Sequence, residues 1–174
     1  MLETPRLRLR EFCADDAEGL VRLNADLNVL RYTGEPPLVA GAGPEQLMRH
    51  YASYDDNGFG RWALIRRQDD RFIGFCGLRR SDRTGDVDLG LRLFPEFWSQ
   101  GYATEAARGA LEAGFRQFGL QEITGRAMRE NLPSITILQK LGMKYRDMIE
   151  DDGEFWLEYS VTADRFLNEF LHRG

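Results

Sequence analysis

The sequence is poor in the residues from which metal sites and hydrolytic triads are built. Its 174 residues include two cysteines and two histidines. Cys13 and Cys76 form no C-x-x-C motif and have no histidine at ligand spacing, so neither a zinc site nor a disulfide framework is supported. We expect both cysteines to be small core residues and the protein to bind no metal. His50 and His172 occur without a G-x-S-x-G elbow, so a triad hydrolase also lacks support.

Phosphate-binding fingerprints, long apolar runs and blocks of one charge are also missing. The absence of G-x-x-x-x-G-K-[ST] and G-x-G-x-x-G argues against a P-loop or dinucleotide fold. No apolar run approaches the ~18 residues of a membrane span, and the first four residues do not resemble a signal peptide. The net charge is −5, with acidic and basic residues interleaved. We therefore expect a cytoplasmic protein with neither nucleic acid nor membrane as a partner.

Length and periodicity predict one α/β domain spanning residues 1–174, with a central sheet covered by helices on both faces. In residues 6–10, apolar and charged residues alternate, which predicts a strand with its leucines inward and its arginines in solvent. The other predicted strands are 61–67, 72–79, 86–93, 123–128, 145–150 and 154–162. The predicted helices begin near residues 15, 44, 102, 134 and 162.

The segment 86–118 is the centre of this arrangement and predicts a strand, a short turn and a long helix. Pro95 ends the alternating strand, and helical spacing of apolar residues begins at Tyr102. Gly101 therefore stands directly before a helix start. The first N–H groups of a helix are unpaired and carry the positive end of its dipole, so such a turn can bind an anion. A glycine at a helix start can equally serve only a turn or close packing.

The sequence around this turn resembles motif A of the GNAT acyltransferase superfamily, whose signature is R/Q-x-x-G-x-G/A. Trp98 stands at the first position, and W-x-x-G-Y-A-T-E-A is similar to the subgroup of ribosomal-protein N-terminal acetyltransferases, as is the opening T-P-R-L-x-L-R. The resemblance covers essentially the whole chain. It implies that the turn binds the pyrophosphate of acetyl-CoA through Ser99, Gln100, Gly101, Tyr102, Ala103 and Thr104.

A second segment, 130–143, resembles the N-x-x-S/A…K-x-G-F motif of the same superfamily. Leu138 occupies the position where many members carry a tyrosine that protonates the departing CoA thiolate. The resemblance to the subgroup implies that Ser134 supplies this proton instead, and that Asn131 orients CoA or Ser134. From the residues alone, Ser134 could equally bond the backbone of its helix, and Asn131 could be a turn or cap residue.

The resemblance also implies the form of the sheet and further site residues. The sheet would be mixed and mostly antiparallel, with its fourth and fifth strands, here 86–93 and 123–128, splayed into a V. Backbone N–H groups at Leu91 and Leu93 would then bind the pantetheine arm and the oxyanion of the reaction. Asp88 lies approximately where the superfamily places a strand-borne carboxylate base. A solvent-facing strand carboxylate is the alternative.

The activity implied is acetyl transfer from acetyl-CoA to a primary amine, directly and in a ternary complex. The acceptor would be a peptide or protein N-terminus, or a small-molecule amine. Deprotonating an α-amine at about pH 7.5 costs about 0.4 kcal/mol, whereas a lysine costs about 4 kcal/mol, so an N-terminus needs only a weak base. The loop at 33–35 would contact the acceptor or be an ordinary surface loop. We expect a monomer or homodimer.

Two other functions fit parts of this pattern. A non-catalytic acyl-CoA-binding module with the same fold is favoured by Leu138, which removes the usual acid. A nucleotide-binding protein would use the Gly101 turn for another pyrophosphate, although no other motif in the chain supports it.

Overall fold

The computed structural model describes every residue except 36–47, 50, 53, 152 and 171–174. The helix predicted to begin near residue 44 lies largely outside the described residues. The strands are β1 (Leu2–Glu3), β2 (Leu7–Arg10), β3 (Arg61–Arg66), β4 (Arg71–Arg80), β5 (Val87–Leu93), β6 (Glu122–Met128), β7 (Lys144–Asp151) and β8 (Glu154–Thr162). The helices are α1 (Ala17–Ala25), α2 (Leu27–Leu30), α4 (Tyr54–Asn57), α5 (Tyr102–Arg116), α6 (Leu132–Lys140) and α7 (Ala163–Arg165). Short turns of other helix types occupy Ala14–Asp16, Pro95–Phe97 and Phe166–Phe170.

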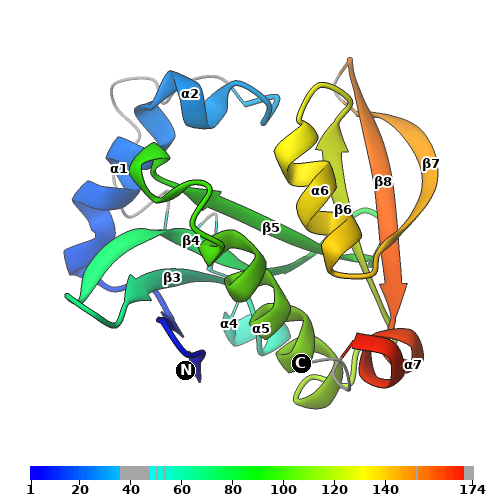
Figure 1. Ribbon diagram of the computed structural model, residues 1–174, viewed down its shortest axis with the longest axis horizontal. Coiled ribbons are helices and arrows are strands. Elements are labelled where there is room, and N and C mark those ends of the chain that lie inside the picture. Colours follow the sequence, from blue (N-terminus) through cyan, green and yellow to red (C-terminus); the bar gives the residue numbers. More distant parts are fainter. Residues whose placement is uncertain (36–47, 50, 53, 152, 171–174) are drawn as a thin grey trace.

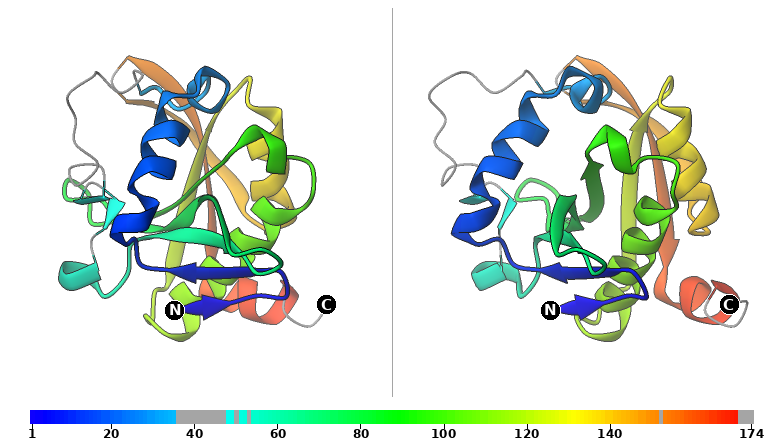
Figure 2. Two further views of the ribbon diagram at one scale, coloured as in Figure 1. Left: turned by 90° about the vertical axis from the view of Figure 1, so that its left-hand side faces the viewer. Right: turned by 60° about the vertical axis from the view of Figure 1, so that its left-hand side comes forward.

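The described strands form one sheet in the order β1-β2-β3-β4-β5-β6-β8-β7. Every neighbouring pair is antiparallel except β5 and β6, which are parallel. Helix α1 covers one face of the sheet and α5 the other (Figures 1 and 2). The predicted α/β fold, with a mixed and mostly antiparallel sheet, is confirmed.

The core is the layer between the sheet and these helices. Leu7 and Leu9 of β2 are fully buried, as their alternation predicts. Helix α5 packs onto the sheet through small residues at helical spacing, of which Ala106 and Ala110 are fully buried. Small side chains bring the helix axis close to β4 and β5, so the helix start is held at a fixed place beside the sheet. No helix in the described part of the chain is long and apolar enough to cross a membrane.

The first predicted helix is interrupted in the structure. Asp26 has extended backbone angles, φ −76° and ψ 114°, and its carboxylate accepts hydrogen bonds from the N–H groups of Asn28 and Val29. These bonds cap α2 and compete with continuation of α1, which is the usual effect of Asp at a helix boundary. The chain therefore turns after α1, and the segment after α2 reaches Arg92 of β5.

One core prediction is wrong. Cys13 is exposed, at the start of the turn Ala14–Asp16, because its segment lies on the surface between β2 and α1. Cys76 is fully buried in β4, as expected. Burial raises the pKa of the Cys76 thiol to about 12, so that almost none of it is thiolate near neutral pH.

Thiol labelling should therefore separate the two cysteines. In the native protein, iodoacetamide is expected to alkylate Cys13 and to leave Cys76 unmodified, because the reactive species is an accessible thiolate. Mass spectrometry of peptides after labelling measures both sites. Denaturant should expose the second site. Equal labelling of both thiols in the native state would contradict the core described above.

Candidate active site

The separation of β5 from β6 creates the candidate site. Strand β5 pairs with β4 along its whole length, from Val87 to Leu93, but with β6 only at Asp88↔Thr124 and Leu89↔Gly125. Beyond these two pairs the strands diverge, and β6 pairs fully with β8 instead (Figure 1). The predicted V between the strands is therefore present, with its closed end at Asp88 and Thr124.

The backbone of β5 offers unpaired donors on the side of the V. The N–H of Phe94 donates to the carbonyl of Ile73 in β4 at 3.1 Å. Because backbone groups alternate in direction along a strand, the N–H groups of Leu91 and Leu93 point to the opposite edge, toward the V. On that edge the indole Nε1 of Trp98 donates to the Leu93 carbonyl at 2.8 Å. The direction of these N–H groups suits the role predicted for Leu91 and Leu93.

The predicted pyrophosphate turn has the geometry of an anion site. Ser99 and Gly101 have φ values of +58° and +82°, and α5 begins at Tyr102. The left-handed backbone at Gly101 suits glycine, because a Cβ would strain it. No side chain caps the helix, so the N–H groups of Tyr102, Ala103 and Thr104 lack an intrahelical acceptor and face outward from the helix start. Uncapped N–H groups at the positive end of a helix dipole fit a pyrophosphate.

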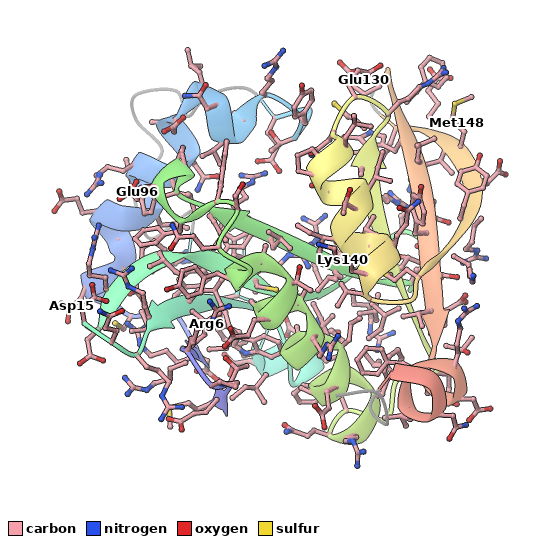
Figure 3. All side chains as sticks on the ribbon, viewed as in Figure 1. Arg6, Asp15, Glu96, Glu130, Lys140 and Met148 are labelled. Carbon is pink, nitrogen blue, oxygen red and sulfur yellow. The ribbon has the colours of Figure 1, made fainter. Side chains whose placement is uncertain are left out.

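Arg6, which the sequence predicted to be in solvent, lies beside this turn and the start of α5 (Figure 3). Its Nη1 donates to the carbonyl of Gln100 at 3.0 Å, and its guanidinium lies over the ring of Tyr102. A Cβ on Gly101 would lie 3.3 Å from Nη2, so this nitrogen faces the turn. The structure thus adds a cation to a site that was predicted from backbone groups alone.

Glu105 holds Arg6 in that position. Its carboxylate accepts from the Thr4 hydroxyl at 2.6 Å, from the Arg6 N–H at 2.8 Å and from Arg6 Nε at 2.6 Å. Burial alone would raise the pKa of the Glu105 carboxyl. The hydrogen bonds from Thr4 and Arg6, with the charge of Arg6, instead hold this pKa below its usual range. These contacts agree with the structural role of a carboxylate in the first turn of a helix.

Asn131 and Ser134 lie at the start of α6, across the V from β5. The side-chain oxygen of Asn131 accepts from the Ser134 N–H at 3.2 Å and caps the helix. The Ser134 hydroxyl is half-buried and makes no hydrogen bond within the described part of the chain. Leu138 is buried against β6, where a Cβ on Gly125 would lie 2.6 Å from its Cδ2.

Asp88 lies at the closed end of the V in a pair with Arg61, which the sequence did not single out. The Arg61 side chain crosses the sheet over Gly90, where a Cβ would lie 2.5 Å from its guanidinium carbon. It bonds the Asp88 carboxylate and, at 2.9 Å, the Asp88 carbonyl. Burial alone would raise the pKa of Asp88, but the charges of Arg61 and Arg79 and the bond from Arg61 lower it. A base role for Asp88 remains a prediction, and the pair with Arg61 disfavours it.

The segment after α2 reaches both arms of the V. Glu35 pairs with Nη2 of Arg92 in β5 at 2.8 Å, and Arg92 also bonds Asn24 of α1. Gly34 lies against β8, where a Cβ would be 3.0 Å from the ring of Trp156. The loop predicted to contact the acceptor thus spans the open end of the V, on the α1 side of the sheet. The negative charge of Glu35 is already paired.

Known proteins with this architecture identify the family. A sequence model described as the acetyltransferase (GNAT) domain matches residues 6–144, so the chain belongs to the GNAT family. It is an N-acetyltransferase: it is 29% identical over 164 residues to "Uncharacterized N-acetyltransferase YnaD" of Bacillus subtilis (strain 168), covering 91% of this chain and 93% of that one. The similarity to the ribosomal-protein subgroup remains a prediction.

Solved structures share the fold. An acetyltransferase from Agrobacterium tumefaciens superimposes with a TM-score of 0.81 and 22% identity, covering 92% of each chain. The spermidine N-acetyltransferase of Vibrio cholerae, solved with CoA and spermine, superimposes with a TM-score of 0.78 and 20% identity. That match covers 95% of this chain and 100% of the other. Enzymes of this fold use acetyl-CoA. Among the described residues, no cluster of His, Cys, Asp or Glu could hold a metal ion.

The contacts of Glu105 predict how stability responds to acid. A carboxyl whose pKa is lower in the folded state stabilises the protein above its unfolded-state pKa, about 4.3 for Glu, and this contribution disappears as the pH falls through the folded-state value. Glu105→Gln should therefore lower the thermal midpoint at neutral pH and flatten its fall below about pH 4.3. Glu112→Gln, an exposed site on the same helix, is the matched control. Parallel acid profiles for wild type and Glu105→Gln would refute the role assigned to Glu105.

Proposed function

We propose that the protein binds acetyl-CoA along the V and transfers the acetyl group directly to a primary amine, with an N-terminal α-amine as the favoured acceptor. The observation that carries this proposal is the uncapped start of α5 beside the unpaired edge of β5. One feature fits a pyrophosphate and the other fits an extended amide-containing chain. Binding of CoA would use both.

Different parts of the site would bind different parts of the donor. Backbone N–H groups from Ser99 to Thr104 would bind the pyrophosphate, and Arg6 would supply a positive charge beside it. The N–H groups of Leu91 and Leu93 would bind the pantetheine arm and the thioester carbonyl. A sheet edge binds an extended amide chain through alternating hydrogen bonds, as a further strand would.

The donor supplies an activated thioester, and the protein places an amine against it. The neutral amine nitrogen forms a bond to the acetyl carbon and gives up one proton. The carbon–sulfur bond breaks, and the sulfur leaves as a thiolate that takes up one proton, so that an amide and the CoA thiol result. Preorganised N–H groups of β5 would stabilise the negative charge that develops on the carbonyl oxygen. We assign the proton to Ser134, because its hydroxyl lies at the start of α6 on the opposite arm and Leu138 cannot supply it.

The acceptor must lose a proton before it attacks. Asp88 is a weak base in this structure, because the charges around it lower its pKa. An α-amine, which loses its proton near neutral pH, fits a site with such a base, whereas a lysine side chain does not. A peptide or protein N-terminus is therefore the favoured acceptor. The spermidine enzyme of Vibrio cholerae supports amines as a class of acceptor, through the shared fold.

The alternative, a non-catalytic acyl-CoA-binding module, rests on Leu138. Leu138 stands where many members of the superfamily have tyrosine. Its side chain is buried against Gly125 and fills the core beside β6, so it does not occupy the V. Acetylation of any amine above the uncatalysed rate would rule out the module. A nucleotide-binding protein would instead bind ATP more tightly than CoA.

Donor binding can be tested by calorimetric titration of acetyl-CoA into wild type and Gly101→Asp. The added carboxylate should repel the pyrophosphate, so binding should weaken at least about tenfold. Gly153→Asp is the matched control, because Gly153 has a φ of +80° in an open turn and suffers the same strain and charge change. Absence of acetyl-CoA binding to wild type would refute the proposed function.

The acid role can be tested with Ser134→Ala. Because Asn131 bonds the backbone N–H of Ser134, the cap survives this substitution and the fold should be unchanged. We expect kcat to fall about 10²-fold or more at saturating substrates, with little change in KM, as for loss of a general acid. Thr136→Ala removes a hydroxyl from the exposed side of the same helix and should have no effect. Full turnover by Ser134→Ala would exclude Ser134 as the acid.

A further inference from the structure

A polar cavity adjoins the closed end of the V. Its volume is about 380 Å³, and the residues that matter here are Arg79, Arg83, Asp88, Thr124, Arg126 and Asp151. We call it the arginine pocket. Asp88 and Thr124 belong both to this pocket and to the pair that closes the V. A molecule whose reactive group lies in the V can therefore extend directly into the pocket.

The pocket lies on the α1 side of the sheet, opposite the side of α5 and α6. Asp88 and Arg92 share one face of β5, and Arg92 contacts Asn24 of α1. On β6, Thr124 and Arg126 share the face opposite to Gly125, which meets Leu138 of α6. The pyrophosphate turn belongs to α5. The pocket is thus separated by the sheet from the donor side and faces the acceptor side.

Two arginines that line the pocket, Arg79 and Arg126, have N–H groups without an acceptor among the described residues. Arg79 stands directly opposite Asp88 across β4 and β5, and its only ion pair among the described residues is with Asp88 at 3.6 Å. Its guanidinium, with five N–H groups, makes no hydrogen bond within that part of the chain. Arg126 bonds Glu158 and Asp151 through Nε and Nη1, which leaves Nη2 available.

The acidic residues of the pocket do not cancel these donors. Asp88 is bonded by Arg61, and Asp151 is shared by Arg126 and Arg83. The remaining two lining acids, Asp82 and Asp86, are exposed on the loop between β4 and β5, at the rim. A cationic group that has passed the rim formed by Asp82 and Asp86 would lie beside the guanidinium groups of Arg79 and Arg126. An anionic group would meet available N–H donors, and charge-assisted bonds of this kind are strong.

We propose that the arginine pocket binds an anionic side chain of the acceptor, with Arg79 as its main contact. The anion is carried on the second residue, directly after the residue that bears the reactive α-amine. This inference rests on the proposed function and specifies the acceptor for the same site. Opposed residues on neighbouring strands have Cβ atoms about 4.5–5.5 Å apart, and one residue of extended chain spans about 3.3–3.6 Å. The thioester carbonyl would bind at Leu91, three residues or about 10 Å along β5 from Asp88, which stands opposite Arg79. The second residue of an extended acceptor, its side chain and the Arg79 side chain together span this distance.

The test uses four tripeptide amides that share the same α-amine: Ser-Asp-Ala, Ser-Asn-Ala, Ser-Arg-Ala and Ser-phosphoserine-Ala. Released CoA thiol measures kcat/KM for each with saturating acetyl-CoA. The Asp peptide is expected to exceed the Asn peptide at least about tenfold, and the Arg peptide to be the poorest. The phosphoserine peptide tells which anion the pocket prefers. If kcat/KM for this peptide exceeds that for the Asp peptide, the preferred anion is a phosphate; if it is lower, the preferred anion is a carboxylate.

Variants test the contact itself. Arg79→Gln should remove most of the preference for Asp, measured as the ratio of kcat/KM for the Asp and Asn peptides. The ratio is the readout because Arg79 also contacts Asp88, and a change in this base affects both peptides alike. Arg79→Glu should shift the preference toward the Arg peptide. Arg116→Gln, an exposed arginine of α5, is the control.

The outcomes separate the two proposals. Equal or faster acetylation of the Asn or Arg peptide by wild type would overturn the arginine pocket as an anion site and leave the acetyltransferase proposal intact. An Asp preference unchanged in Arg79→Gln would also overturn it. If acetyl-CoA binds but no peptide is acetylated, then the proposed acceptor class fails, and this inference fails with it.

Discussion

The structure depends on the early separation of two parallel strands. Strand β5 pairs with β6 at only two residue pairs, while β5 stays paired with β4 and β6 with β8 along their whole lengths. An unpaired strand edge is normally unfavourable unless something covers it, since its N–H groups lose hydrogen bonds without a partner. Here the edge lies between α5 and α6, where an extended cofactor can pair with it. The fold therefore carries an incomplete sheet, and we propose that the pantetheine chain of CoA takes the place of the missing strand.

Arginines fix the parts around this gap. Arg6 ties the N-terminal segment to the pyrophosphate turn, Arg61 crosses the sheet to Asp88, and Arg92 fastens the loop after α2 at Glu35. Each is hydrogen-bonded, and Arg61 and Arg92 are also buried, so these side chains position backbone as well as neutralising charge. Arg79 differs, because it has a weak ion pair and unused donors. This contrast distinguishes arginines that hold the site together from one that is available to a ligand.

The sequence predicted what depends on local pattern. Alternation located seven of the eight described strands to within about two residues, and the glycine before a helical run located the start of α5, because both signals arise from neighbouring residues. Strand β1 was not predicted, since two residues are too few to show alternation. Contacts between distant residues were not predictable in this way. Arg6 and Glu105 are 99 positions apart, and Arg61 and Asp88 are 27 apart. Gly90, which leaves room for Arg61, was the available signal. Cys13 was misplaced because a small residue can occupy core or surface equally well.

Amide hydrogen exchange measured with and without CoA tests the central claim most directly. If the helix start and the edge of β5 bind the donor, then CoA should slow exchange at the N–H groups of Gly101 to Thr104 and at Leu91 and Leu93. Exchange in β7, at the far edge of the sheet, should not change. Protection confined to other segments, with these N–H groups unaffected at saturating CoA, would contradict the account.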